Sequence, residues 1–479
     1  MSELPKGWVA CTPSDLVNDP KNEIVDGPFG SNLKASEYTD EGTPIVRIQN
    51  VKRMAFLNKN IKYVTDEKAE FLKRHSFKSG DLLITKLGEP LGLTCIAPEY
   101  LDEGIIVADI VRLRPNPEVN RKCLAYLLNS EGVIKQINTH TKGSTRARIN
   151  LSVVRNLNIS FPPLAEQKRI VEKLDEVLAQ VDTIKARLDG IPALLKRFRQ
   201  SVLASAVSGK LTEEWRGEEK LILDEVSNLP QSWQVKAANE VCIKVQSGST
   251  PRNDPFNQGG TVPFLKVYNI VNQKIDFDYK PQFVTTDTHQ DKLKRSIAYP
   301  GDVLMNIVGP PLGKVAILTD QYPEWNLNQA ITLFRANKEL LINKYLYFVL
   351  CEGALVRDVM PETKGSVGQI NISLTQCRES KVPLPPLEEQ KEIVRLVDQY
   401  FAFADTIEAQ VKKAQARVDN LTQSILAKAF RGELVAQDPN DEPADKLLER
   451  IAQARKEAEA LAKAAKKAGA TKKKVAKSA

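Results

Sequence analysis

The sequence predicts an α+β protein with two mixed α/β domains separated by two long helices that form an antiparallel coiled coil. Two observations predict this fold class. A series of short motifs from the first half of the chain returns in the same order in the second half. Each half also ends in a stretch whose apolar residues recur at alternating steps of three and four. That spacing places apolar residues on one face of a long helix and favours packing against a second helix. We therefore expect a pseudo-twofold tandem duplication of one domain and one helix.

The duplication rests on seven matches whose offsets stay between 219 and 225 residues. Examples are LPKGW and LPQSW at 4–8 and 229–233, GDLLITKLGEPLG and GDVLMNIVGPPLG at 80–92 and 301–313, and PPLAEQKRIV and PPLEEQKEIV at 162–171 and 385–394. A period this long describes a whole domain with its helix, since solenoid repeats are only about 20 to 45 residues long. We expect domains at 1–160 and 216–382, helical regions at 161–215 and 383–437, and a partly disordered tail rich in Ala and Lys at 438–479.

The first domain shows both strand and helix patterns. Residues 45–51, 82–87 and 105–113 are short runs rich in β-branched residues, the last two framed by Gly and Pro. Residues 123–137 have the apolar spacing of an amphipathic helix, and 157–161 form a strand that ends at Pro162 and Pro163. The alternation of both element types makes each domain mixed α/β.

The two helical regions carry complementary apolar seams. Helices of about 40 residues would be about 60 Å long at ~1.5 Å per residue. Gly190 and Pro192 interrupt the first helix and predict a kink or break, because proline removes a helical hydrogen bond. The residues expected to pair the helices are Leu174, Val181, Leu188, Leu195 and Val202 in the first region and Val397, Ile407, Val411, Val418 and Leu421 in the second.

Composition narrows the class of protein. Of the 479 residues, 42% are hydrophobic and 27% charged, as in soluble globular proteins. No apolar run reaches about 18 residues and the first residues are too polar for a signal peptide, so we expect no membrane contact and a cytoplasmic protein. The six cysteines lie far apart without a C-x-x-C pair, which favours reduced thiols and no metal site.

The sequence contains no motif typical of a catalytic site. SGKLT at 208–212 has Leu where a phosphate-binding loop needs Ser or Thr, and no Pro-Asp dipeptide of a PD…(D/E)xK nuclease occurs. The three histidines are scattered without partner residues. We expect no catalytic residue and no enzymatic activity in this chain alone.

Local charge indicates nucleic-acid binding instead. The formal charge of +8 comes mostly from the tail, because 451–479 contains nine Lys or Arg and two Glu. No acidic residue lies between Glu131 and Glu166, and that window contains Lys135, Lys142, Arg146, Arg148 and Arg155. Basic side chains among Ser, Thr and Asn suit DNA phosphates and guanine edges, although a solvated loop has the same composition. The candidate DNA-binding residues are Arg47, Gln49, Asn50, Lys142, Ser144, Arg146 and Arg148 in the first half and Lys266, Tyr268, Asn269, Lys364 and Ser366 in the second.

The helical regions resemble a known family. PPLAEQKRIVEKLDEVLAQVDTIKARLDGIPALLKRFRQSVLASAVSGKLTEEWR and FAFADTIEAQVKKAQARVDNLTQSILAKAFRGELVAQ are similar to the central and distal helical regions of type I restriction–modification specificity subunits, in particular the enteric type IA group. The resemblance covers residues 1 to about 437. The Lys-rich tail lies outside the duplicated layout, and the family's base-contacting residues vary with specificity, so no single contact is transferred to this sequence.

The resemblance implies a non-catalytic subunit with two target recognition domains, each reading one half of a bipartite, asymmetric site in double-stranded DNA. The helices would act as spacer and as docking surface for two methyltransferase subunits, and motor–nuclease subunits would complete the complex. S-adenosylmethionine, ATP and Mg²⁺ would be used by those other subunits, with no cofactor bound by this chain. The alternative is a coiled-coil scaffold that bridges two protein partners without specific DNA binding.

Overall fold

The computed structural model describes residues 4–141, 147–217, 228–252, 256, 258–360 and 371–475, with side chains described up to residue 461 and at 463 in the last range. The chain divides into two compact units, Met1–Arg187 with Ala414–Ala479 and Leu188–Lys413. Both units mix helices and sheets, and the long helix α6 (Leu164–Val207) packs against the long helix α12 (Leu387–Ala429). The predicted fold class is confirmed.

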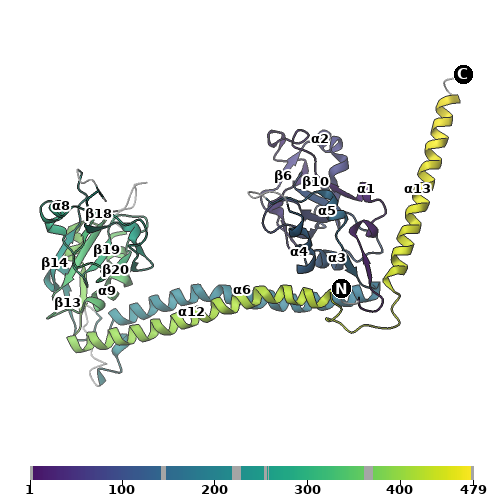
Figure 1. The fold of residues 1–479 in the computed structure, drawn as a ribbon. Coiled ribbons are helices and arrows are strands. Elements are labelled where there is room, and N and C mark those ends of the chain that lie inside the picture. Colours follow the sequence, from purple (N-terminus) through teal and green to yellow (C-terminus); the bar gives the residue numbers. More distant parts are fainter. Residues whose placement is uncertain are drawn as a thin grey trace. The chain divides into compact units, whose positions relative to one another are not determined.

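The first unit contains small sheets covered by short helices (Figure 1). One sheet has the order β6-β3-β10-β7, in which β3 and β10 are parallel and the other pairs antiparallel, and a second, antiparallel sheet has the order β2-β11-β8-β9. Strands β1 and β12 pair by themselves, as do β4 and β5. In chain order the elements before α6 are β1 (Val9–Cys11), α1 (Pro20–Glu23), β2 (Ile24–Asp26), β3 (Thr43–Val46), β4 (Val51–Lys52), β5 (Ala55–Phe56), β6 (Lys62–Val64), α2 (Asp66–Phe71), β7 (Ser76–Lys78), β8 (Leu82–Thr85), β9 (Thr94–Ile96), β10 (Glu103–Ile106), β11 (Ile110–Leu113), α3 (Arg121–Leu128), α4 (Glu131–Thr139), α5 (Leu151–Arg155) and β12 (Ile159–Phe161).

The second unit repeats this topology. Its antiparallel sheet β14-β22-β19-β20 corresponds to β2-β11-β8-β9, and its sheet β18-β15-β21, with β15 and β21 parallel, corresponds to β6-β3-β10. The pairs β13 with β23 and β16 with β17 correspond to β1 with β12 and β4 with β5. Its elements are β13 (Gln234–Ala237), α7 (Ala238–Val241), β14 (Cys242–Ser247), β15 (Val262–Leu265), β16 (Ile270–Val271), β17 (Lys274–Ile275), β18 (Phe283–Val284), α8 (Thr286–Gln290), β19 (Val303–Asn306), β20 (Val315–Ile317), β21 (Asn326–Leu327), β22 (Ile331–Ala336), α9 (Asn343–Glu352), α10 (Ala354–Val359), α11 (Leu374–Glu379) and β23 (Lys381–Leu384).

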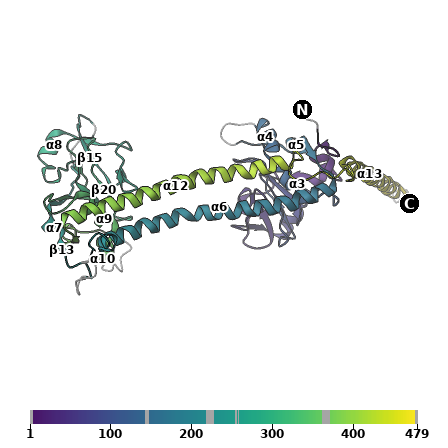
Figure 2. The same cartoon turned by 90° about the horizontal axis from the view of Figure 1, so that it is seen from below.

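Helices α6 and α12 run side by side in both views (Figure 1, Figure 2) and are antiparallel. In the first unit Lys185 forms an ion pair with Asp419 at 2.6 Å, whereas in the second unit the later residue Arg199 pairs with the earlier residue Asp405 at 2.6 Å. Of the predicted seam residues, Leu421 is 43% exposed and therefore does not belong to the buried seam. Leu174, Val181, Leu195, Val202, Val397 and Val411 are buried, and Leu188, Ile407 and Val418 are half-buried.

Of the kink or break expected at Pro192, the break is wrong, because α6 is continuous from Leu164 to Val207. Proline cannot donate to the carbonyl of Leu188, but Pro192 is exposed, so water can satisfy that carbonyl. The following turns are held against α12, where Phe198 makes an edge contact with Tyr400 and Arg199 pairs with Asp405. The predicted helix at 123–137 is also corrected, since Asn129 and Ser130 separate α3 from α4. The buried Asn129 side chain donates to the carbonyls of Thr94 and Ala125, both at 2.8 Å.

Each long helix is anchored to its own globular unit by the Glu-Gln pair in its first turn. In the first unit the Trp8 indole donates to Glu166 at 2.9 Å, and the Gln167 amide accepts from the Asn120 N–H and donates to the Pro162 carbonyl. The second unit has the same bonds, from Trp233 to Glu389 at 2.9 Å and between Gln390 and the backbone of Ile342 and Pro385. An acidic residue is also favourable near the positive N-terminal end of a helix.

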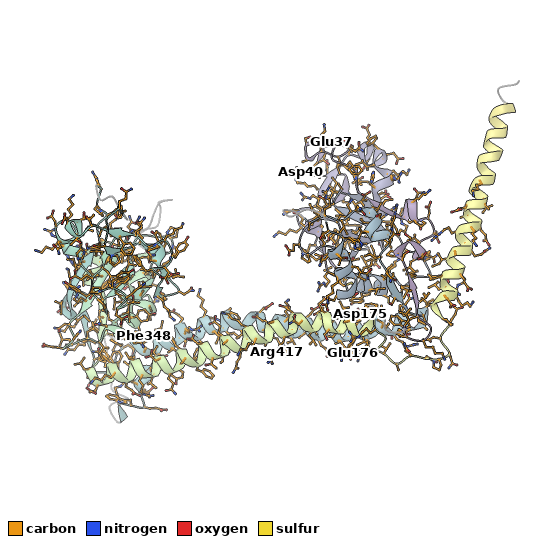
Figure 3. The ribbon with its side chains drawn as sticks, in the orientation of Figure 1. Glu37, Asp40, Asp175, Glu176, Phe348 and Arg417 are labelled. Carbon is orange, nitrogen blue, oxygen red and sulfur yellow. The ribbon has the colours of Figure 1, made fainter. Side chains whose placement is uncertain are left out.

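A second contact with the globular unit lies more than two turns further along each helix. Lys122 forms an ion pair with Asp175 at 2.6 Å, and Lys344 forms the equivalent pair with Asp398 at 2.6 Å. The Tyr126 hydroxyl also donates to Asp175, which Figure 3 labels on α6. The PPLxEQK repeat thus encodes the joint between globular unit and helix.

The two anchor carboxylates have different electrostatic surroundings. Glu389 forms a buried ion pair with Arg216, whose side chain is 4% exposed. Near Glu166, the cation Arg169 is itself paired with Asp441. Burial raises the pKa of Glu166 above its ordinary value, against the hydrogen bond from Trp8 and the charge of Arg169, which lower it.

The C-terminal segment belongs to the first unit, although the sequence predicted a separate tail. Helix α13 (Ala444–Val475) buries Ala444, Leu447 and Ile451 in its first turns, the last two within the core of the first unit. The Arg455 guanidinium then donates to the carbonyls of Ser14, Val17 and Asn18. The helix also extends to Val475, through residues expected to be disordered.

Replacing Leu447 by Ala should destabilise the first unit by about 2–5 kcal/mol, because a buried leucine leaves a cavity. Faster amide hydrogen exchange in the core strands β8 and β11 would report the loss. Leu461→Ala on the same helix is the matched control, since Leu461 is 72% exposed. Equal exchange in the two variants would contradict the docking of α13.

The two anchor glutamates should respond oppositely to the same substitution. Because the folded state holds the Glu166 proton more tightly than the unfolded chain, the stability that Glu166 contributes falls as the pH rises above about 4.5, its ordinary pKa. Glu166→Gln lacks this loss, so its stability relative to wild type should grow as the pH rises above about 4.5 and level off once Glu166 is ionised. Glu389→Gln should instead cost about 3–5 kcal/mol, because it leaves Arg216 buried without its carboxylate. Denaturant titration with unit-resolved hydrogen exchange measures both, and identical responses would refute the distinction.

Candidate nucleic-acid interface

Five segments of the first unit meet where the parallel strands β3 and β10 end. The Val107 N–H donates to the Val46 carbonyl at 3.2 Å, and the Gly27 N–H donates to the Ile110 carbonyl at 3.1 Å. The Lys86 N–H donates to the Asp109 carbonyl at 2.7 Å, and the Lys86 carbonyl accepts from the Ile149 N–H at 3.1 Å. We call this group the first junction, comprising 26–27, 46–47, 86–87, 107–110 and 148–149.

The second unit builds the same group from corresponding residues. Its four bonds run from Asn328 to Leu265 (3.0 Å), Gly248 to Ile331 (2.9 Å), Ile307 to Ala330 (2.9 Å) and Ile372 to Ile307 (2.8 Å), with the donor first in each pair. We call this the second junction, comprising 247–248, 265–266, 307–308, 328–331 and 371–372. Its backbone bonds match those of the first junction one for one.

One glycine in each junction is required by close backbone approach. A Cβ atom on Gly27 would lie 2.1 Å from the carbonyl carbon of Val107, and one on Gly248 would lie 2.2 Å from the carbonyl oxygen of Leu327. Only glycine fits where two backbones approach so closely. The glycine at this position therefore allows the same close approach of two backbone segments in both units.

Three of the sequence-predicted residues, Arg47, Arg148 and Lys266, lie in these junctions, and Gln49 and Tyr268 lie two residues further along the chain. In the first unit Arg47 follows β3 and is half-buried, Gln49 is exposed, and Arg148 is exposed beside Leu87. Lys266 and Tyr268 occupy the positions of Arg47 and Gln49 in the second unit. The remaining candidates Lys142, Ser144, Arg146, Lys364 and Ser366 lie outside the described residues.

Aromatic rings and cations alternate next to the second junction. The Lys266 ammonium lies 5.6 Å from the centre of the Phe256 ring, and Lys280 lies 5.1 Å from that of Tyr279. Tyr268 and Tyr279 make an edge contact at 6.0 Å, and burial raises the pKa of Tyr268 above its ordinary value. Mixed cationic and aromatic surfaces suit phosphates and base faces together.

The two predicted asparagines do not belong to this surface. Residues 48–50 form a short 3₁₀ turn where the strand predicted at 45–51 had been expected to continue, and residues 267–269 form the same turn in the second unit. Asn50 and Asn269 are buried inside these turns. The Asn50 amide accepts from the Arg47 N–H at 3.0 Å and donates to the carbonyls of Leu57 and Lys59. Asn269 makes the equivalent bonds to Lys266, Asp276 and Tyr279. Both are structural residues, so their prediction as DNA contacts is wrong.

Two cations of the acid-free window are also engaged elsewhere. Lys135 forms an ion pair with Glu131 at 2.7 Å along α4. Arg155 donates to the Ile24 carbonyl at 2.6 Å and ties α5 to β2. Within the described part of the window, Arg148 is the cation that the fold brings to the junction.

Sequence reasoning missed three charged residues of the first junction. Asp26 forms an ion pair with Lys86 at 2.6 Å, and Asp109 forms one with Arg148. Aligning the two halves would have found them, because the second half has Ser247, Ile307 and Ala330 at these positions.

The described residues show no arrangement typical of a metal site or of a membrane-spanning helix. They contain no group of three or more His, Cys, Asp or Glu that could hold a metal ion, and no helix long and apolar enough to cross a membrane. Burial raises the pKa of the Cys95 and Cys351 thiols to about 12, so both stay protonated at neutral pH. His289 is buried between Glu324 and Asn326.

Comparison with known proteins defines the family. Residues 25–193 and 230–415 match the type I restriction modification DNA specificity domain. The chain is 33% identical to the type I restriction enzyme EcoKI specificity subunit of Escherichia coli K12, over 91% of both chains. It is also 33% identical to the EcoBI specificity subunit of Escherichia coli, over 85% of this chain and 84% of that one. The fold resembles the HsdS subunit from Thermoanaerobacter tengcongensis with a TM-score of 0.53 and 21% identity, over 90% of this chain and 98% of that one. The chain belongs to the family of type I restriction–modification specificity subunits.

Asn50→Ala should destabilise the first unit by about 1–3 kcal/mol, because it removes one buried acceptor and two donors and leaves their backbone partners unsatisfied. The neighbouring exposed variant Gln49→Ala should change stability by less than about 0.5 kcal/mol. Thermal unfolding of the two variants tests this pair. A stable Asn50→Ala protein would show that the turn does not depend on this side chain.

Proposed function

We propose that this chain is the DNA sequence-specificity subunit of a type I restriction–modification complex. The observation that carries the proposal is the double junction, in which the same backbone bonds present different side chains. A protein that reads two unlike half-sites needs one frame and two reading surfaces. A scaffold for protein partners would not need such a pair.

Each domain then reads one half of a bipartite, asymmetric site in double-stranded DNA. The first junction offers the charged residues Arg47 and Arg148, and the second offers Lys266 beside Tyr268 and Tyr279. Charged forks suit guanine edges and phosphates, whereas aromatic rings suit base faces. The predicted domains at 1–160 and 216–382 are the two target recognition domains of this proposal.

The helical regions at 161–215 and 383–437 act as spacer and as docking surfaces for two methyltransferase subunits. Both units expose apolar side chains on their parts of α6 and α12, which supports this role. Ile184 and Leu421 are 46% and 43% exposed in the first unit, and Leu194 and Phe403 are 54% and 59% exposed in the second. One such surface per unit matches two docked subunits.

Catalysis belongs to the partners in this proposal. The methyltransferase subunits bind S-adenosylmethionine and methylate adenine, and motor–nuclease subunits use ATP and Mg²⁺. The present chain contributes recognition and positioning, consistent with a family of non-catalytic subunits in the cytoplasm.

Sequencing of adenine methylation in cells with and without the gene tests the function. A bipartite adenine motif with an unread spacer should disappear on deletion and return on complementation. Replacing residues 216–382 by the corresponding domain of the EcoKI relative should change one half of the motif and leave the other half intact. An unchanged methylation pattern after deletion would refute the proposal.

A further inference from the structure

Two ion pairs of the first junction have no counterpart among the described residues of the second. Lys86 pairs with Asp26, and Arg148 pairs with Asp109. The strand register and the loop bridges place Ser247, Ile307, Ala330 and Asn371 at the corresponding positions of the second unit. The four backbone bonds persist there without these charges. Neither ion pair is therefore needed to build a junction.

A third pair provides the contrast, because it is repeated. Arg114 binds both oxygens of Asp81 at 2.8 and 2.7 Å, and Arg335 binds both oxygens of Asp302 at 2.9 and 2.7 Å. Both carboxylates are buried, with side chains 5% and 4% exposed. A pair that recurs in both units belongs to the frame, and one that occurs in a single unit is free to serve what that unit reads.

Both residues of the Asp109–Arg148 pair are held by their backbones. The Asp109 carbonyl accepts from Lys86, and Arg148 forms an isolated bridge with Leu87. Ile149, the next residue, is 2% exposed and is bonded to the Lys86 carbonyl. The Arg148 side chain itself is 55% exposed. Its Nη2 contacts the Asp109 carboxylate while more than half of the side chain faces solvent.

The chemistry of this pair favours base reading over phosphate binding. Exposed ion pairs add little stability, and a carboxylate at a DNA-binding surface opposes the phosphates. A carboxylate that holds one end of a guanidinium does restrict the direction of its remaining N–H donors. A guanidinium directed in this way suits the O6 and N7 atoms of a guanine edge, which an arginine fork can bond together.

We propose that Arg148 reads a guanine edge in the half-site bound by the first domain, and that Asp109 is the positioning residue that directs its guanidinium. This assignment rests on the proposed function as a DNA-specificity subunit. Asp109 makes the first domain selective at the expense of general affinity for DNA.

The experiment measures binding of the full-length chain to two duplexes over a range of KCl concentrations. One duplex carries the motif found by methylation sequencing, and the other has the same base composition in scrambled order. In Asp109→Asn the preference for the motif should fall about tenfold, while affinity for the scrambled duplex is retained or increased. Arg148→Lys keeps the charge but loses the fork, so it should lower the preference similarly with an unchanged salt slope.

Asp40→Asn is the matched control, because it removes the same charge from the same unit. Asp40, which precedes β3 and is labelled in Figure 3, is 94% exposed and forms an ion pair with Lys62. Its replacement should leave the preference for the motif duplex unchanged. Thermal unfolding checks that Asp109→Asn is folded, and Arg148→Lys tests the assignment independently of that variant.

If Asp109→Asn bound both duplexes more tightly by the same factor, the assignment would be overturned, because Asp109 would then only repel phosphates. An unchanged preference in Arg148→Lys would also overturn it. A wild-type chain that does not distinguish the two duplexes would instead refute the proposed function. If the wild type prefers the motif duplex and both variants prefer it equally, the role of the Asp109–Arg148 pair is refuted and the proposed function is not.

Discussion

The structure depends on the buried joint between each globular unit and the first turn of its long helix. A tryptophan indole, Trp8 or Trp233, donates to a buried glutamate, and the following glutamine bonds the backbone on both sides. Long helices bury little of their own surface, so their attachment depends on a few directional contacts of this kind. Hydrogen bonds to a buried carboxylate are costly to break. The joint therefore fixes how each domain meets its helix.

The duplication lets one half of the chain serve as the control for the other. Interactions present twice, such as Asp81 with Arg114 and Asp302 with Arg335, maintain the frame. Interactions present once, such as Asp109 with Arg148, are dispensable for that frame. The second junction lacks those two ion pairs, keeps a cation at Lys266, and lies next to the aromatic contact of Tyr268 with Tyr279. A shared backbone with different side chains is how one scaffold can carry two specificities.

Part of the candidate site could be predicted from the sequence, and the errors of that prediction have physical causes. The repeats identified corresponding positions in the two halves, and the predicted cations Arg148 and Lys266 both lie in the junctions. Asn50 was misassigned because a polar side chain in an apparent strand can face solvent, and only the 3₁₀ turn shows that it bonds backbone. The role of Arg155, a cation of the acid-free window, was not visible in the sequence because its partner, the Ile24 carbonyl, lies 131 residues away. Leu421 follows the helical period, but the partner helix does not cover it.

The sequence by itself determined the duplication, the fold class, the paired helices and the family, because these follow from local periodicity and from motifs in fixed order. The tertiary structure alone decided that α6 continues through Pro192, that α13 docks on the first unit, and which polar residues face solvent. Each of these outcomes depends on contacts between residues distant in the chain, such as Arg455 with the carbonyls of Ser14, Val17 and Asn18. Periodicity reports which face of an element is apolar, whereas the packing partner determines which residues that face covers.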